Sequence, residues 1–501
     1  MTFRPYKVLP HKMRTAILAA AFLLSSCQTN TALPTITVQP TLAFETPPAT
    51  TVSAPAATPT QSATANANIP DVTSLKGKTI LFWHPWSGEM AKQAGELVAE
   101  FNKSNTWGIQ VQVQSLYSAG ALYDAVQAGA AAGAAAGAAA GAQVQPKQLP
   151  QVIAATSDQL AEWSANGDRM VDLNEYIHQA QIGMDDAEVQ GFQPIFWKQD
   201  QVGQRQVGLP ALRTAQVIFY NQTWAKALGF QSPPQTPEAF KEQACAAAKH
   251  NNSLGDKNMA GTGGWLIDND ALTTLSWMSA FGAKTIPDAE GQPYTFESKA
   301  GDQTVTFLRK MFDEGCAWTG LSPMPYGYFA QRMALFYTDS SSNIYVQASY
   351  MEQQKRKDEW TVLPFPGEDG KPLVYASGYS YALFKTDDPQ AQLAGWLFAR
   401  WLEQPEVAVK LAQVLPSIPV SRGVTQQISG DQTKFPWSMV LPLAESARPA
   451  PALSTWREVR RLFEDAAWQI YRLPAEGLDK VLPQTLPQLD AAVKDTLKKT
   501  P

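Results

Sequence analysis

The sequence predicts an α/β fold of two lobes, each a mainly parallel sheet flanked by helices. Apolar strand-like runs at 78–83, 109–113 and 151–155 are separated by segments with helical periodicity. Strands that alternate with helices indicate βαβ units, whose strands pair in parallel. The chain also has 501 residues, which exceeds one typical domain and therefore favours two lobes.

The elements of the N-terminal half follow from the spacing of apolar side chains. The run 78–83 is almost continuously apolar, as expected of a buried strand, whereas 109–113 alternates apolar residues with polar ones. Between 91 and 102 apolar residues recur every three or four positions, which predicts an amphipathic helix. These residues are Ala94, Leu97, Val98 and Phe101. A further helix is expected to begin at Leu122.

In the C-terminal half, residues 206–230 indicate two strand-like pieces with an intervening turn, followed by a helix. Thr236 is placed to cap another helix, with Pro237 at its first position. The remaining expected elements are strands at 333–337 and 377–384, a helix through 396–401 and helices in the last 55 residues.

Residues 128–142 form a low-complexity tract in which Gly recurs among Ala. Alanine favours a helix, and each Gly weakens it by up to about 1 kcal/mol. The tract is therefore interpreted as a low-complexity extension of the preceding helix, by expansion of a repeated codon block. Close helix packing through the Gly spacing is the alternative.

The N-terminus has the features of an export signal. Its basic residues are Arg4, Lys7, Lys12 and Arg14, and residues 1–26 hold no acidic one. The apolar stretch 15–24 is too short to span a bilayer but suits a signal-peptide core. The segment ending at Cys27 resembles a bacterial lipobox, so Cys27 is expected to carry lipid after removal of residues 1–26. An ordinary secretory signal with a chance cysteine is the alternative.

Residues 27–75 are rich in Thr, Pro and Ala and nearly uncharged, which predicts a disordered stalk behind the lipidated cysteine. The protein would then be exported and anchored to the outer face of the cytoplasmic membrane. The formal net charge of −5 falls to −9 once the four basic residues of the signal are removed. Such a chain lacks the basic surface that nucleic-acid binding requires.

The number and spacing of cysteines and histidines limit which disulfides and metal sites the folded part can contain. After lipidation of Cys27, only Cys245 and Cys316 remain, either bridged or separately buried. Histidines are few and widely separated, and no metal-binding spacing is present. No metal site and no cofactor is therefore predicted.

From residue 76 onward the chain resembles the family-1 extracellular solute-binding proteins of ABC importers, which include sugar-binding and glycerol-3-phosphate-binding lipoproteins. The motifs that carry the resemblance occur in the family's order: ILFWHPWSGEMAKQAGELVAEFNKSN, LPQVI with MVDLNEYI, VGLPALRTAQVIFYNQTWAKALGFQSPPQTPEAF, MALFYTDSSSNI, LPFPG, SGYSYALF and WLFARWLEQPE. Gln151 stands where Asp is usual, and the Ala/Gly tract is an insertion relative to the family pattern.

The resemblance implies a type II-like periplasmic-binding-protein fold with hinge crossovers between the lobes. Lobe one would hold residues 76–212 and 364–410, and lobe two residues 213–363 and 411–501. A monomer would capture a small-molecule solute, by this resemblance a carbohydrate, in the interlobe cleft and deliver it to the permease subunits of an ABC transporter.

A sugar needs aromatic rings against its C–H faces and polar side chains at its hydroxyls. Because ligands bind beyond the carboxyl ends of strands in open α/β sheets, post-strand residues are the candidates. Arg213 and the Gly378 region enter through the family comparison. The predicted ligand-binding residues are Trp83, Trp86, Tyr117, Ser157, Asp158, Arg213, Trp265, Asp268, Tyr337, Asp339, Ser340, Ser341, Gly378 and Tyr379.

Each aromatic candidate has core packing as its alternative, most strongly Trp83, which lies inside a strand. Asp158 and Asp339 could equally cap helices. Five further tryptophans are assigned to packing because they lie at helical spacing among apolar residues. They are Trp277, Trp396, Trp401, Trp456 and Trp468.

Capture of a sugar-like solute without catalysis is the leading functional hypothesis. A surface-anchored glycoside hydrolase with paired carboxylates is the alternative from another class, although no acid/base pair or nucleophile motif is recognisable. A binding protein for glycerol-3-phosphate or its diesters ranks lower, because only Arg213 and Arg422 are available as phosphate ligands. Presentation of the solute to a sensor is also open.

Overall fold

The computed structural model describes residues 69–134, 149–322, 324–367 and 369–499. Cys27, the signal segment, most of the expected stalk and the second half of the Ala/Gly tract lie outside these ranges. Within them, no helix is both long enough and apolar enough to cross a membrane. The Ala/Gly tract begins inside α2 (Ala119–Ala134), so its first residues extend that helix as expected.

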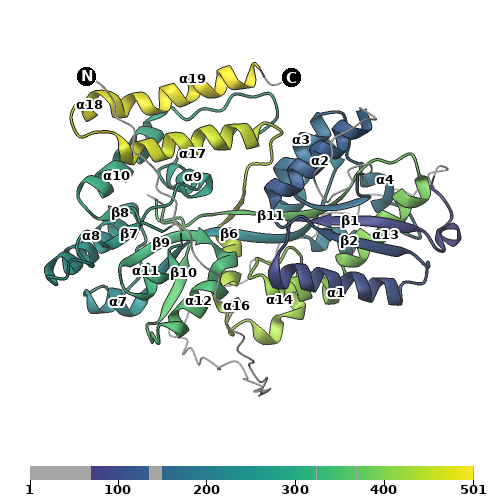
Figure 1. The fold of residues 1–501 in the computed structure, drawn as a ribbon, viewed down its shortest axis with the longest axis horizontal. Helices are drawn as coiled ribbons and strands as arrows, with labels where there is room; N and C mark the ends of the chain where they lie inside the picture. The colour runs from purple at the N-terminus through teal and green to yellow at the C-terminus, as the bar shows by residue number, and fades with distance from the viewer. Residues whose placement is uncertain (1–68, 135–148, 323, 368, 500–501) are drawn as a thin grey trace, which may run out of the picture. The chain divides into compact units, whose positions relative to one another are not determined.

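The described chain forms two lobes around one continuous strand order (Figure 1). The first lobe contains β1 (Thr79–His84), β2 (Gln110–Ser115) and β3 (Val152–Thr156). Strand β1 pairs in parallel with both of the others. The second lobe contains β7 (Gly263–Leu266), β8 (Ala317–Trp318) and β9 (Ala334–Ser340), with β7 parallel to both neighbours. The parallel outer strands confirm the predicted fold class.

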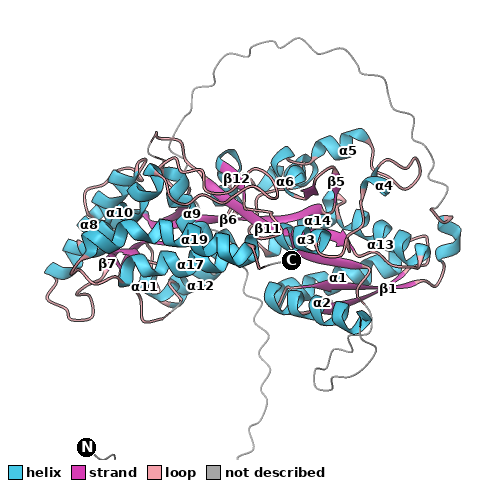
Figure 2. Ribbon diagram, turned by 90° about the horizontal axis from the view of Figure 1, so that it is seen from above, coloured by secondary structure: helices cyan, strands magenta, loops and turns pink. Residues whose placement is uncertain are grey.

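Two long strands connect the lobes, as Figure 2 shows from above. They are β6 (Leu209–Asn221) and β11 (Val374–Leu383), which pair antiparallel with each other. Strand β11 also pairs with β3 of the first lobe, and the second half of β6 pairs with β9 of the second. The complete strand order is β2-β1-β3-β11-β6-β9-β7-β8, with β10 (Trp360–Leu363) on β6 and β12 (Ala447–Pro449) on β11.

The alternation of side chains along β1 assigns helices to the two faces of the first sheet. Phe82 faces α1 (Gly88–Ser104) and α13 (Pro389–Leu402), where its ring meets Phe398. The next residue, Trp83, points to the opposite face, among side chains of α2 and α3 (Ser157–Ala165). Because neighbouring residues in a strand face opposite sides, the unbroken apolar run of β1 is explained by burial on both faces.

Helices also cover both faces of the second sheet. One hydrophobic cluster joins the sheet to helices α8 (Pro237–Ser253), α9 (Ala271–Ala280), α10 (Lys299–Asp313), α17 (Trp456–Arg472) and α19 (Thr485–Leu497). The other face packs against α11 (Tyr326–Ala330) and α12 (Ile344–Gln353) within a cluster that continues into the first lobe beneath the crossover strands.

The remaining elements are short. They are α4 (Asn174–Ile177), α5 (Asp186–Gly191), α6 (Pro194–Gln199), β4 (Gln201–Val202), β5 (Arg205–Gln206), α7 (Gln222–Ala227), α14 (Pro405–Val414), α15 (Arg422–Gln427), α16 (Trp437–Val440), α18 (Leu478–Val481) and the 3₁₀ turns Val72–Leu75, Ser341–Asn343, Ser429–Asp431, Leu441–Ser446 and Leu482–Gln484.

Three boundary expectations are corrected by the structure. The turn expected within residues 206–230 is absent, because β6 runs unbroken through Arg213 and Thr214, which pair with Gly378 and Ser377 of β11. The expected stalk extends too far, since Asp71 caps the turn Val72–Leu75 and Leu75 is fully buried in the core. The lobe boundary expected between residues 410 and 411 falls inside α14, which packs against α1.

Other local predictions are confirmed. The Thr236 hydroxyl accepts a hydrogen bond from the Ala239 amide, with Pro237 opening α8. Cys245 of α8 and Cys316 before β8 form a disulfide across 71 residues, the bridged arrangement of the two that the sequence left open. This bond fixes α8 to the edge of the second sheet. The five tryptophans assigned to packing are all buried or half-buried.

Candidate functional site

Polar side chains from both lobes meet where α3, β11 and α17 come together. Asp158 lies in the first turn of α3, immediately after β3, and Tyr379 of β11 pairs with the neighbouring Thr156. A capping box between Thr156 and Gln159 fixes the start of the helix. Burial raises the pKa of the Asp158 carboxyl, although the Thr156 hydroxyl and the charge of Arg460 oppose the shift.

The second lobe contributes three carboxylates after β7 and at the end of β9. Asp268 accepts hydrogen bonds from the hydroxyls of Thr338 and Thr273. Burial, reinforced by the charge of Asp270, raises the pKa of Asp268 to about 7. Burial also raises the pKa of Asp339, which accepts a hydrogen bond from Tyr326.

Arg460 of α17 joins the two sets of carboxylates. Its guanidinium lies 2.9 Å from Asp270 and 2.7 Å from Glu464, and its charge acts on Asp158 of the other lobe. Burial alone would lower the pKa of Arg460, but the charges of Asp270 and Glu464 outweigh it and raise the pKa. The sequence prediction missed Arg460, because it lies about 300 residues beyond Asp158 on the polar face of an amphipathic helix.

A second contact joins the lobes beside this cluster. The guanidinium of Arg457, at the start of α17, lies 3.7 Å from the ring centroid of Tyr123 in α2. The Tyr123 hydroxyl donates a hydrogen bond to Glu162 of α3, whose pKa is raised by burial. Figures 1 and 2 both place the start of α17 next to α3. The structure therefore shows the two lobes in contact across the candidate site.

Two aromatic residues, Trp86 and Tyr379, carry polar atoms without a partner among the described residues, and the charge of Asp158 acts on Tyr379. Trp86 and Tyr379 meet edge to face, with ring centroids 5.9 Å apart. Within the described chain, neither the indole N–H of Trp86 nor the hydroxyl of Tyr379 has a hydrogen-bond partner. Trp86 also stacks on His84, whose Nδ1 accepts a hydrogen bond from the Trp86 amide. Burial lowers the pKa of His84 to about 4, so its ring is neutral at pH 7.

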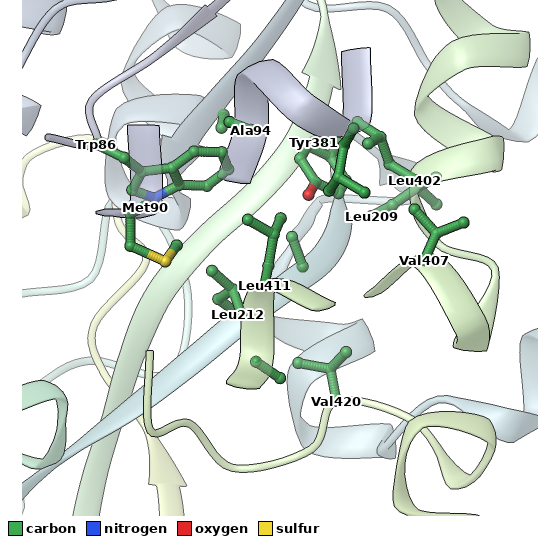
Figure 3. Close-up of a cluster of buried hydrophobic side chains, with 14 of the residues drawn as sticks. Trp86, Met90, Ala94, Leu209, Leu212, Tyr381, Leu402, Val407, Leu411 and Val420 are labelled. Carbon is green, nitrogen blue, oxygen red and sulfur yellow. The ribbon is translucent and has the colours of Figure 1, made fainter. Parts of the chain in front are cut away.

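Trp86 belongs to the core as much as to the site. Its side chain is 5% exposed and lies beside Met90 of α1, within the cluster that includes Leu212 of β6 and Leu411 of α14 (Figure 3). Tyr379 is more accessible, because it lies at the half-buried middle of β11. Loss of Trp86 would therefore disturb packing, whereas the Tyr379 hydroxyl can be removed alone.

Several predicted site residues are packed in cores instead. Trp83, Trp265 and Tyr337 are at most 2% exposed, and the Tyr337 hydroxyl donates to Gln347. They face helices because strand alternation turns them away from the junction of the lobes. At Gly378, an added Cβ would lie 1.9 Å from the Leu212 carbonyl oxygen, so this glycine permits the close pairing of β11 with β6.

Arg213 and two predicted serines hold the crossover strands. The Arg213 guanidinium is fully buried and bonds both carboxylate oxygens of Asp200, at 2.9 and 3.0 Å. Its other donors go to Gln199, Ser380 and the carbonyls of Leu212 and Tyr379, which leaves none for a ligand. Ser157 donates to Asp200, and Ser341 donates to the Pro416 carbonyl and accepts from the Ala215 amide.

The last two predicted residues are Tyr117, which is exposed, and Ser340, which caps a turn. Tyr117, directly after β2, has a φ of +66° and is 74% exposed. Ser340 caps the turn Ser341–Asn343 through its hydroxyl. The structure thus brings together Trp86, Asp158, Tyr379, Asp268 and Asp339 from the prediction, and adds Asp270, Arg460 and Glu464.

The charge of this group limits what it can bind. The group contains two guanidinium groups, those of Arg460 and Arg457, and five carboxyl groups. The carboxyl groups belong to Asp158, Asp268, Asp270, Asp339 and Glu464. Carboxylates accept hydrogen bonds, and only a protonated one donates, so the group suits hydroxyl or cationic donors better than anions. Among the described residues, the one close cluster of metal-ligand types contains the disulfide-bonded Cys245 and Cys316, whose sulfurs are not free thiolates.

The sequence profile of the bacterial extracellular solute-binding proteins matches residues 96–436, well over half of the chain. The chain belongs to this family. No curated protein sequence matches this solute-binding protein significantly.

Solved structures of other binding proteins share the fold of this solute-binding protein. The sugar-binding protein MalE from Xanthomonas citri superposes with a TM-score of 0.65 at 20% identity, covering 85% of this chain and all of that one. Maltose-bound MalE3 from T. maritima gives 0.64 at 15% identity, covering 84% of this chain and all of that one. UgpB from Mycobacterium tuberculosis, in complex with glycerophosphocholine, gives 0.65 at 15% identity, covering 84% and 99%.

Proposed function

We propose that this solute-binding protein captures a sugar or sugar-like solute between its lobes and delivers it to the permease of an ABC importer. The observation that carries the proposal is the Tyr379 hydroxyl, which has no hydrogen-bond partner in the described chain and lies within reach of the Asp158 charge, with the Trp86 ring packed against the tyrosine ring. Aromatic rings next to hydrogen-bonding groups suit a ring of alternating C–H and O–H groups.

The charge balance favours a hydroxylated ligand over a phosphate ester. A phosphate would bring negative charge to a junction that already holds five carboxylates, and like charges are strongly unfavourable in a half-buried site. Arg460, whose charge acts on Asp158, is already paired with Asp270 and Glu464. Binding of glycerol-3-phosphate or its diesters therefore stays the weaker candidate, despite the fold shared with UgpB.

The residues would act in different ways. Tyr379 would stack on the ligand or donate its hydroxyl, and Asp158 would accept hydrogen bonds from sugar hydroxyls. From the second lobe, Asp270 and Arg460 would bind the opposite edge of the solute. Because these groups come from α3, β11, the loop after β7 and α17, a bound solute would stabilise contact between the lobes.

The anchoring at Cys27 completes the proposal. A lipid on Cys27, followed by a stalk that ends before Val72, would hold the folded part close to its permease at the outer face of the membrane. Mass spectrometry of protein from a lipoprotein-processing host should show diacylglycerol on Cys27. A mature chain that begins elsewhere and lacks lipid would overturn this part of the proposal.

Calorimetric titration with maltose, maltotriose and glycerophosphocholine tests the solute class. At least one saccharide should bind with one-to-one stoichiometry, and glycerophosphocholine should bind more weakly. Replacing Tyr379 by Phe removes one hydrogen bond, worth about 1 kcal/mol, so saccharide affinity should fall roughly five- to tenfold. The melting temperature should change little, because the Tyr379 hydroxyl has no partner in the described chain.

Tyr381→Phe is the matched control, since Tyr381 lies two residues further along β11 and is buried in the core. This variant should bind saccharide as the wild type does. Tighter binding of glycerophosphocholine than of any saccharide in a broader screen would refute the sugar assignment. Equal affinities of Tyr379→Phe and wild type would instead refute the assignment of the site.

A further inference from the structure

A separate cavity of about 380 Å³ lies on the first lobe, away from the junction between the lobes. Its walls come from α5, from the link between α13 and α14, and from α15. Phe192, Met184 and Pro405 contribute apolar surface to it, and Gln404 and Arg422 lie at its exposed rim. Its volume lies at the low end of small-molecule pockets in proteins.

Glu403 is the unusual residue of this cavity. It stands at the C-terminal cap of α13 and is one of the residues that line the cavity, although it is only 8% exposed. The buried Oε1 has no hydrogen-bond partner in the described chain. A buried carboxylate oxygen without a donor is costly, and such atoms are rare in folded proteins.

The charges behind Glu403 do not supply the missing partner. Burial raises the pKa of the Glu403 carboxyl well above its ordinary value, and the charge of Asp200 adds to this effect. Arg213 opposes the shift, but its donors are fully used by Asp200, Gln199, Ser380 and two carbonyls. Among the residues that the structure describes, Glu403 therefore has no cation of its own.

The other charged side chains that line the cavity do not pair with Glu403, so a further cation can bind there. Arg400 is occupied, because it donates to the Ile182 carbonyl at 3.1 Å and to Glu188 at 3.2 Å. Asp185 caps α5 by accepting from the Glu188 amide. Arg422, at the rim, has no ion-pair partner among the described residues. Glu403 is thus the one carboxyl group of the lining without a side-chain or amide partner in the described chain.

We propose that this cavity is a second binding site, which takes a small molecule with a primary ammonium or guanidinium head and an apolar body. The head would donate to the Glu403 carboxyl and stabilise its ionised form, because hydrogen bonds between ions are stronger than neutral ones. The body would pack on Phe192 and Met184. Leu402 and Val407, on either side of Glu403 in sequence, are buried in the core and fix the chain segment that carries it (Figure 3).

The test uses n-butylammonium as the cationic probe and 1-butanol as its neutral counterpart, detected by saturation-transfer difference NMR on the full folded chain. The cation should bind and 1-butanol should bind at least fivefold more weakly. Glu403→Gln preserves shape and removes the group that can ionise beside a cation, so it should lower affinity for the cation at least fivefold. Absence of binding to the wild type, or equal binding of both probes, would overturn the proposal.

Glu406→Gln is the matched control, because Glu406 is an exposed carboxylate three residues away that does not line the cavity. It should leave the affinity for butylammonium unchanged. Arg422→Gln removes a positive charge from the rim and should tighten binding of the cation about twofold. A loss equal to that of Glu403→Gln in either variant would overturn the assignment to Glu403. Saccharide titration of the same variants keeps this test separate from the proposed function.

Discussion

The buried ion pair between Asp200 and Arg213 should be indispensable for stability, although its arginine resembles a ligand contact in the sequence. Both side chains are fully buried, and their closest approach is 2.9 Å. Asp200 also accepts hydrogen bonds of 2.6 Å from Ser157 and Ser380. Asp200→Asn would leave the Arg213 charge in the core of the crossover without its counter-ion.

The expected magnitude follows from that geometry. Removal of one partner of a buried ion pair costs about 3–5 kcal/mol, because the remaining charge is neither solvated nor paired. We expect the lower end of this range, since Glu403 is close enough for its charge to interact with Arg213. The double variant Asp200→Asn with Arg213→Met removes both charges and should recover part of the loss.

Urea denaturation, followed by tryptophan fluorescence, measures the change in the free energy of unfolding. Asp168→Asn is the control, because Asp168 pairs with Arg205 and Lys385 at the surface and is 60% exposed. That variant should shift the midpoint far less than Asp200→Asn, since exposed ion pairs contribute little. A loss below about 1 kcal/mol for Asp200→Asn would refute the reasoning. Weakened saccharide binding without lost stability in Arg213→Met would restore Arg213 as a ligand contact.

Two further predictions concern the junction between the lobes. The pKa of Asp268 is about 7 in the folded state, which is above its value in the unfolded state. Between these two pKa values the folded chain binds more protons than the unfolded chain, so the free energy of unfolding falls as the pH rises through this window. In Asp268→Asn, the urea midpoint should therefore fall less between pH 4.5 and pH 8 than in the wild type. An equal fall in both proteins would contradict the raised pKa of Asp268. Arg457→Ala removes the cation–π contact with Tyr123, worth about 0.5–1 kcal/mol, and should lower saccharide affinity roughly two- to fivefold. Arg461→Ala, on the same helix and paired only with Glu458, should bind normally in calorimetry, and an equal loss in both variants would refute a specific role for Arg457.

Sequence patterns predicted the local structure well where one physical rule decided it. The apolar run at 78–83 and the alternation at 109–113 became β1 and β2, and the Thr236-Pro237 pair capped α8 as expected. The turn expected within β6 was wrong. Arg213 and Thr214 are polar residues that would suit a turn, but the strand continues through them. Their hydrogen bonds in the folded crossover could not be inferred from neighbours in the sequence.

The candidate site was only half predictable for a related reason. Post-strand position drew attention to Asp158, Asp268 and Asp339, because the carboxyl ends of parallel strands share one edge of a sheet. It could not distinguish them from Trp265 and Tyr337, whose side chains face helices.

The sequence by itself determined the α/β class, the order of strands and helices, the family motifs and the expectation of an exported chain. These properties depend on residues close together in the chain, where periodicity, capping and composition act. Only the tertiary structure showed that Arg460 interacts with both Asp158 and Asp270 and that Arg213 forms a buried ion pair with Asp200. It alone also showed that Glu403 has an oxygen without a hydrogen-bond partner in the described chain. Electrostatic interactions and desolvation depend on distances in space, and the fold sets these distances between residues far apart in sequence.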